Sequence, residues 1–239
     1  FIWHICFAEK PMVIIAEFGS NPAAYGWNFE SWCRAAAQAG ATHAKVQLWQ
    51  TDHFPEAEWE EKWRYEFPRS RLKEFVETAH RYGLKAGASV FDADAVYLTT
   101  HLLTCDFLKL AAREQLNFEL RSSCVESGKP VYRSVSDLEN FVPWRREVTL
   151  FAIQHYPARM TGALLTLLSV ARFFKNTGWS WGWSSHTRGW LDCAMAARLG
   201  AVVIEKHLAL ERSDPEGGHS LLPGKFMHMV RRVQAWAVN

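Results

Sequence analysis

The chain has 239 residues, of which 49% are hydrophobic and 22% are charged, and its formal net charge at neutral pH is +2. These values are typical of a globular protein with a buried core, and they exclude a disordered chain and a strongly basic nucleic-acid-binding protein. Five widely spaced cysteines form no Cys-x-x-Cys pair, and no apolar run reaches the roughly 20 residues of a membrane span, so we expect a cytoplasmic protein without membrane or nucleic-acid partners.

Short apolar segments alternate with amphipathic segments along the chain. The expected strands are Met12–Gly19, His43–Leu48, Lys85–Val90, Phe107–Leu110, Pro130–Ser134, Val148–Gln154, Ser180–Ser184 and Val202–His207. The expected helices are Asn28–Ala39, Ser70–Tyr82, Ala93–Leu103, Arg113–Ser127, Val135–Phe141, Gly162–Lys175, Gly189–Leu199 and Pro223–Trp236. Eight strand–helix pairs without a long linker predict an α/β protein with a (β/α)8 TIM barrel, a single domain over residues 1–239 whose first strand begins near residue 12.

The longest irregular stretch, Trp49–Pro68, follows the second expected strand. Loops that follow barrel strands lie at the C-terminal face of the barrel, where active sites are built. A loop of this length usually has a function of its own. We therefore expect this stretch to cover a substrate.

Two histidines end neighbouring strands near the C-terminus: His186 follows the seventh strand and His207 closes the eighth. Parallel neighbours lie about 5 Å apart, so the two imidazoles could share one metal ion. Side chains alternate along a strand, which places Glu205 on the face of His207 and Ser184 on the face of His186. Two interpretations remain open at this point: hydrogen-bonded structural histidines, or a metal-binding pair.

Polar side chains also end the other expected strands. In chain order they are Glu17, Lys45, Gln47, Ser89, Lys109, Ser134, Gln154 and Tyr156. Lys45 and Lys109 are flanked by apolar residues, and a buried lysine is costly unless an anion pairs with it. The alternative is a solvent-exposed position at the rim. If both are buried, the pattern indicates an anionic ligand, a phosphate or a carboxylate, beside a metal that binds oxygen.

Several segments, taken in order, resemble motifs of the sialic acid (N-acetylneuraminate) synthase family. They are Ile14–Asn21, Ala41–Gln47, Ser89–Asp92, Phe107–Ala111, Gly128–Val131, Tyr156–Pro157, Gly182–Thr187 and Gly200–His207. The last, Gly-Ala-Val-Val-Ile-Glu-Lys-His, is the most specific, and the resemblance spans about residues 12 to 225. It covers the family's barrel domain only. From the resemblance we expect a barrel domain that lacks the family's C-terminal antifreeze-like domain, which lends an Arg to the partner's sugar site.

The resemblance implies an enzyme, a transferase that condenses phosphoenolpyruvate with an N-acylated hexosamine such as N-acetylmannosamine and releases phosphate. It implies a divalent metal, manganese first and magnesium or cobalt as alternatives, on His186 and His207. The residues implied to hold phosphoenolpyruvate are Lys45, Lys109, Ser89, Ser134 and Ser184. Glu17 is implied at the reacting carbon. The residues implied near the sugar are Gln47, Tyr156 and Glu205, of which Glu205 is a catalytic candidate together with Glu17, Lys45 and Lys109. Gln154 is a further candidate for substrate binding.

The chain departs from the family pattern at several positions. Ala112 stands where a phosphate-binding Ser is usual, Gln154 stands near a usual Asn, and Ser185 replaces an Asp before the first histidine. The segment after the eighth strand is shortened to Glu216–Ser220. Two other functions therefore stay open: a catalytically weakened barrel that binds a sugar or phosphate, and another phosphoenolpyruvate aldol-type synthase. The resemblance also implies a possible homodimer.

Overall fold

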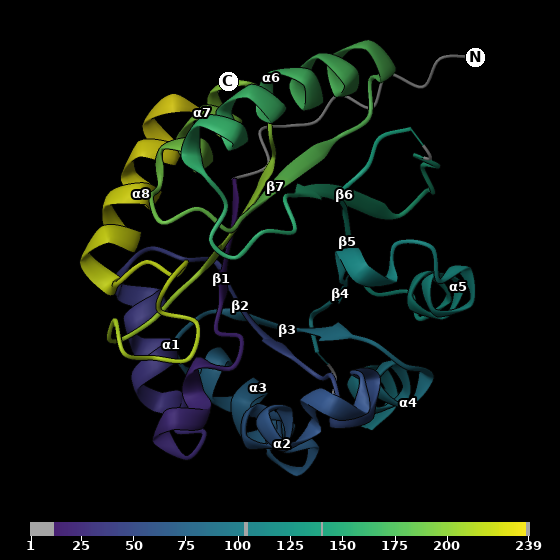
Figure 1. The fold of residues 1–239 in the computed structure, drawn as a ribbon, viewed down its shortest axis with the longest axis vertical. Helices are drawn as coiled ribbons and strands as arrows, with labels where there is room; N and C mark the ends of the chain where they lie inside the picture. The colour runs from purple at the N-terminus through teal and green to yellow at the C-terminus, as the bar shows by residue number, and fades with distance from the viewer. Residues whose placement is uncertain (1–11, 103–104, 140, 238–239) are drawn as a thin grey trace.

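Eight parallel strands close into a barrel in the computed structural model, which describes residues 12–102, 105–139 and 141–237 (Figure 1). The strands are β1 (Val13–Glu17), β2 (His43–Gln47), β3 (Lys85–Val90), β4 (Phe107–Leu110), β5 (Val131–Val135), β6 (Glu147–Ala152), β7 (Trp181–Ser185) and β8 (Val203–His207). The helices are α1 (Phe29–Gln38), α2 (Trp59–Lys62), α3 (Leu72–Arg81), α4 (Ala93–Tyr97), α5 (Phe118–Glu126), α6 (Met160–Thr177), α7 (Leu191–Arg198) and α8 (Pro223–Trp236). The predicted TIM barrel is confirmed, although the expected extent, residues 1–239, includes residues outside those described.

Helix α1 illustrates how the helices attach to the barrel. The Asn28 side chain accepts a hydrogen bond from the Glu30 backbone N–H and so caps the helix start. Phe29, Trp32 and Cys33 recur at helical spacing and are buried against the strands. Burial of this apolar stripe, rather than intrinsic helix propensity, supplies most of the stability of such a helix.

The barrel interior has an apolar layer and a polar layer. The apolar layer is a cluster of Ile15, Phe107, Tyr132, Leu150 and Val203. Two residues further along the same strands are Glu17, Lys109, Ser134, Ala152 and Glu205. Because side chains alternate along a strand, these residues face the same interior one layer nearer the C-terminal ends of the strands. The sequence thus fills the base of the barrel with apolar side chains and places polar ones at its mouth.

The strand register brings the polar residues together across neighbouring strands. Glu17 is paired with Lys45 of β2 on one side and with His207 of β8 on the other. Ser184 of β7 is paired with Glu205 of β8. Since paired residues of parallel strands lie about 5 Å apart, this register alone sets the Glu17 carboxylate beside a lysine and a histidine.

One expected helix is absent. The segment Val135–Phe141 was expected to form the fifth helix, but Val135 belongs to β5 and residues 136–139 form a bend and a turn. Asp137 explains the difference, because its Oδ1 accepts a hydrogen bond from the Glu139 backbone N–H at 2.8 Å. Such local side-chain bonds compete with helix formation. Residue 103, the end of the expected helix Ala93–Leu103, and residue 140, inside the expected helix Val135–Phe141, lie outside the described part of the chain.

A buried ion-pair cluster supports the connection that lacks this helix. The Glu147 carboxylate, at the start of β6, accepts hydrogen bonds from Arg121 Nη2 at 2.5 Å and from Arg133 Nε at 3.1 Å. Both guanidinium groups also donate to the Val142 carbonyl oxygen, at 2.7 and 3.1 Å. The Glu147 side chain is only 1% exposed. The cluster therefore fixes the β5–β6 connection through buried side chains.

Replacing Glu147 with Gln is expected to lower the free energy of unfolding by about 3–5 kcal/mol, because two buried guanidinium groups lose their counter-charge. Urea unfolding followed by circular dichroism measures the change. The matched control is Glu119→Gln on α5, where the glutamate is exposed. A loss below about 1 kcal/mol would show that the cluster contributes little to stability.

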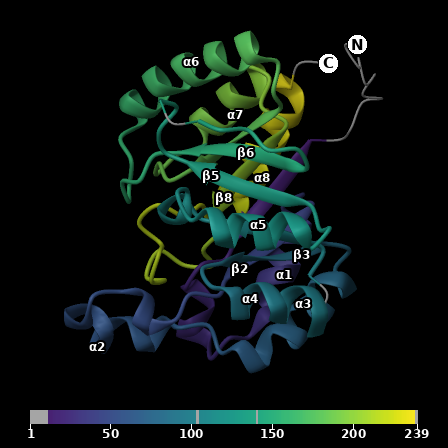
Figure 2. The same cartoon turned by 90° about the vertical axis from the view of Figure 1, so that its right-hand side faces the viewer.

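The loop after β2, which carries α2, and the loop between β8 and α8 extend from the same side of the barrel (Figure 2). Both follow the C-terminal ends of their strands, and they flank the mouth that the polar layer faces. Within the described ranges, no helix combines the length and the apolar character needed to cross a membrane.

Candidate active site

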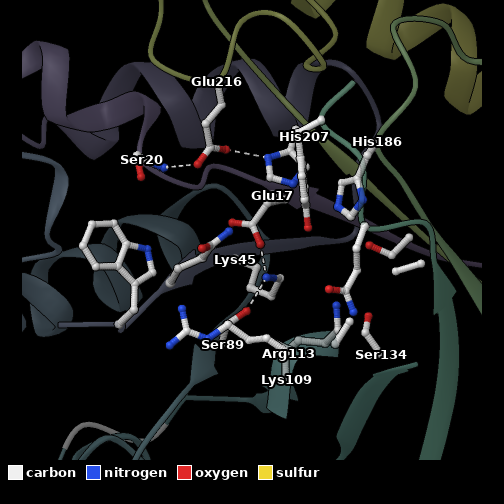
Figure 3. Close-up of a pocket in the computed structure, with 18 of the residues that line it drawn as sticks. Glu17, Ser20, Lys45, Ser89, Lys109, Arg113, Ser134, His186, His207 and Glu216 are labelled. Atoms are coloured by element: carbon white, nitrogen blue, oxygen red, sulfur yellow. Dashed lines mark hydrogen bonds and ion pairs between the residues drawn. The ribbon is translucent and has the colours of Figure 1, made fainter. Parts of the chain in front are cut away.

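A cavity of about 500 Å³ opens at the C-terminal ends of the strands (Figure 3). All twelve residues singled out in the sequence line it: Glu17, Lys45, Gln47, Ser89, Lys109, Ser134, Gln154, Tyr156, Ser184, His186, Glu205 and His207. The two lysines are not rim residues, because Lys45 is 2% exposed and Lys109 is 3% exposed. The strand-end pattern therefore identified one continuous pocket.

Two lysines and two carboxylates form the floor of the cavity. Lys45 Nζ contacts the Glu17 carboxylate and donates to Ser89 Oγ at 2.6 Å. Glu205 joins both lysines, with Oε1 2.7 Å from Lys109 Nζ and Oε2 3.6 Å from Lys45 Nζ. Burial opposes ionisation of Glu205, but the two lysines overcome this effect and lower its pKa. The floor is thus charge-balanced, and an incoming anion would compete with the carboxylates for the lysines.

The two strand-end histidines face each other on one side of the cavity, with ring centroids 5.4 Å apart (Figure 3). His186 Nδ1 lies 2.8 Å from the Ile153 carbonyl oxygen and His207 Nδ1 lies 2.6 Å from Glu216 Oε2. Both partners are acceptors, so each Nδ1 carries the proton and each Nε2 keeps its lone pair. Burial lowers the pKa of both imidazoles, which favours their neutral form. A pair of neutral imidazoles oriented by hydrogen bonds fits a divalent metal ion.

Ser185 has no part in orienting His186. It points out of the barrel, where its Oγ lies 3.0 Å from the Nζ of buried Lys206. The hydrogen-bond partner of His186 Nδ1 is instead the backbone carbonyl oxygen of Ile153.

Glu216 is the main residue that the strand pattern missed. It lies in the loop after β8, and its backbone N–H donates to Asn21 Oδ1 at 2.6 Å. Its Oε1 accepts from the Ser20 backbone N–H at 3.0 Å, while its Oε2 accepts from His207 (Figure 3). The segment Glu216–Ser220 stood out in the sequence only as a shortened one. Two side chains of this segment, the carboxylate of Glu216 and the imidazole of His219, could have identified it from the sequence as part of the site.

Gly19 is needed where Glu216 approaches the backbone. Gly19 has a φ of 54°, and a Cβ there would overlap the Glu216 carboxylate. Gly19→Ala is therefore expected to lower the free energy of unfolding by about 1–2 kcal/mol from backbone strain alone, and also to displace the carboxylate that orients His207.

Gly26→Ala is the matched control, because Gly26 has a φ of 59° but open space around its Cβ position. Manganese titration of both variants separates the two effects. We expect a roughly tenfold weaker affinity in Gly19→Ala only. Equal affinities in the two variants would exclude a role for the Glu216 position.

The loop expected to cover a substrate borders the cavity, but it is less irregular than expected. It contains α2, and Phe54, Lys62 and Tyr65 from this loop line the pocket. Arg113, after β4, stacks its guanidinium over Phe54 at 4.7 Å and completes this outer wall. Tyr156 lies opposite, with its ring centroid 4.3 Å from that of His186. Aromatic rings and positively charged side chains thus line the outer half of the cavity. Such a lining suits a ligand with a polar ring and an acidic or phosphorylated end.

Comparison with known proteins places these features in a family context. The sequence profile of the NeuB family matches residues 32–238. The pseudaminic acid synthase of Helicobacter pylori is 28% identical over 174 residues, which cover 67% of this chain and 50% of that protein. The N-acetylneuraminate-9-phosphate synthase of Mus musculus is 27% identical over 261 residues, covering 95% of this chain and 70% of that protein.

A solved structure supports the fold. The N-acetylneuraminic acid synthetase of Leptospira borgpetersenii, determined in complex with citrate, superposes with a TM-score of 0.86 and 20% sequence identity. The superposition covers 95% of this chain and 84% of that one. At this identity the likeness supports the barrel architecture alone. The chain also spans only half to 70% of the lengths of the two relatives compared by sequence.

Proposed function

The chain belongs to the NeuB family, and on this premise we propose that it condenses phosphoenolpyruvate with an N-acylated hexosamine to give a nonulosonic (sialic) acid and phosphate. The observation that carries the proposal is that buried Lys45 and Lys109 share one cavity with two histidines whose rings are oriented by hydrogen bonds. Phosphoenolpyruvate carries up to three negative charges, and such an anion needs buried cations and hydroxyl donors.

The proposed reaction joins the three carbons of phosphoenolpyruvate to the open-chain sugar. The methylene carbon C3 attacks the aldehyde carbon with the electron pair of the enol double bond, and the aldehyde oxygen takes up a proton. Water then adds to the cation-like C2 and loses a proton. The bond between C2 and the phosphate oxygen breaks and phosphate leaves with the electron pair. The C2 hydroxyl gives its remaining proton to the departing phosphate or to water, and C2 becomes a ketone.

The residues at the phosphoenolpyruvate end have distinct proposed roles. Lys45 and Lys109 bind the carboxylate and phosphate groups of phosphoenolpyruvate. The hydroxyls of Ser89, Ser134 and Ser184 donate hydrogen bonds to these anionic groups. Glu17 stabilises the cation at C2 or takes the proton of the incoming water. A divalent ion on His186 and His207, manganese first and magnesium or cobalt as alternatives, would polarise the aldehyde as a Lewis acid.

The residues near the sugar are proposed from their place in the pocket. They are Gln47, Gln154, Tyr156 and Glu205. Gln154 is positioned by a hydrogen bond from its Nε2 to Ser136 Oγ at 2.9 Å. Glu205 Oε2 has no hydrogen-bond partner among the described residues, so it is available to accept a hydrogen bond from a sugar hydroxyl.

Phosphate release tests the proposal. The protein is incubated with manganese, phosphoenolpyruvate and either N-acetylmannosamine or its 6-phosphate. The phosphorylated sugar is included because a relative is an N-acetylneuraminate-9-phosphate synthase and carbon 6 of the hexosamine becomes carbon 9 of the product. Release that requires one of these sugars and is lost in His207→Ala supports the function. Tight manganese binding without release with any N-acyl hexosamine would leave a binding protein instead.

A further inference from the structure

A third imidazole, that of His219, lies beside the His186–His207 pair. His219 is 8% exposed and belongs to the loop after β8. This loop is held in place from two sides. Arg212 Nη1 donates to the carbonyl oxygens of Gly217 and Ser220, and the Leu221 backbone N–H donates to the His207 carbonyl oxygen. His219 is therefore fixed at the cavity wall rather than carried on a free loop.

The Nε2 atom of His219 has no hydrogen-bond partner among the described residues, although it is buried. A buried polar atom without a partner costs about 1–3 kcal/mol. The nearest acidic atom, Glu216 Oε2, is 3.9 Å away, beyond hydrogen-bond distance. A buried nitrogen of this kind needs an explanation, and an ion that it would bind supplies one.

The spacing of the three rings fits a shared ion. The centroid of His219 lies 4.5 Å from that of His207 and 6.0 Å from that of His186. Imidazoles bound to one ion through nitrogen bonds of about 2.1 Å have centroids roughly 4.5–6 Å apart. Ligand atoms of His207, Glu216 and His219 also lie within 4.8 Å of one another, a group that does not include His186. The Tyr156 ring packs against both His186 and His219, at 4.3 and 5.3 Å, and limits their movement.

We propose that His219 is a third protein ligand of the divalent ion, so that the site presents three imidazoles with the Glu216 carboxylate adjacent. This inference rests on the proposed function, which assigns the ion to His186 and His207. Three nitrogen donors favour first-row transition ions over magnesium, which prefers oxygen ligands. The site is accordingly expected to bind first-row transition ions such as cobalt or zinc more tightly than manganese, and manganese more tightly than magnesium.

Metal titration of the chelator-treated full chain tests the third ligand without any turnover. Free manganese is followed by electron paramagnetic resonance, and nitrogen couplings of the bound ion are resolved by pulsed measurements. We expect three coordinated nitrogens in the wild type and two in His219→Gln, with a manganese affinity roughly 10–100-fold lower. His219→Asn serves as a second substitution, and both are compared with wild type by circular dichroism before titration.

His228→Gln is the matched control, because His228 is an exposed histidine on α8 that packs on Trp190 outside the cavity. Its manganese affinity should equal that of the wild type. Unchanged affinity and nitrogen number in His219→Gln, with a loss in His207→Gln, would overturn the third ligand and leave the proposed function intact. Wild-type affinity in His207→Gln would instead overturn the ion site on which the proposed function depends.

Discussion

Lys109→Met is expected to lower kcat/KM for phosphoenolpyruvate by roughly 10²–10³-fold, the range observed when a buried group that stabilises substrate charge is removed. Lys109 is 3% exposed, and its Nζ lies 2.7 Å from Glu205 Oε1. Methionine keeps most of the side-chain volume but cannot pair with an anion. The loss should appear mainly in binding, which calorimetric titration with phosphoenolpyruvate measures directly.

Lys73→Met is the control for the Lys109 substitution, because Lys73 lies on α3 with a side chain that is 69% exposed. Its kcat/KM should stay at the wild-type value. A Lys109→Met protein that is folded and binds phosphoenolpyruvate within threefold of wild type would contradict the assignment of this lysine to the anion.

Glu17→Gln is expected to produce the opposite kinetic pattern, with kcat lowered by roughly 10²–10⁴-fold and phosphoenolpyruvate affinity nearly unchanged. Glu17 is 1% exposed, its Oε1 accepts from the Gly19 backbone N–H at 2.7 Å, and its Oε2 contacts Lys45. Glutamine preserves the shape and accepts the same backbone bond. It cannot supply the negative charge at C2 or take a proton from water.

Glu77→Gln on α3 is the control for Glu17→Gln, because its side chain is 60% exposed. Steady-state phosphate release and a separate binding measurement distinguish kcat from affinity in both variants. If Glu17→Gln loses affinity in proportion to kcat, then Glu17 acts by positioning Lys45 rather than at the reacting carbon.

The fold and most of the cavity were predictable because both follow from strand periodicity. Lys45, Lys109 and Glu205 sit two residues after an interior position of their strands, so the alternation that defines the apolar layer also defines the polar one. The same rule placed the two histidines at neighbouring strand ends, and the structure brings them to one side of one cavity.

The features that were missed depend on loops and on contacts between segments far apart in the sequence. The expected fifth helix does not form where the Asp137 side chain accepts a hydrogen bond from the backbone. The spacing of apolar residues does not reveal such a bond. Glu216 reaches His207 because several hydrogen bonds fix the loop after β8, one of them to Asn21, 195 residues away in the chain. His219 likewise depends on the path of that loop. No periodic pattern encodes such a path, because its backbone conformation is not repeated along the chain.

The central claim is that the chain forms a carbon–carbon bond while breaking the C2–O bond of phosphoenolpyruvate. Phosphoenolpyruvate labelled with oxygen-18 at its bridging oxygen, together with manganese and the sugar that supports release, tests this claim by mass spectrometry of both products. We expect the label in phosphate and an equal amount of unlabelled nine-carbon acid. Label retained in pyruvate or in the acid, or phosphate formed without the acid, would contradict it.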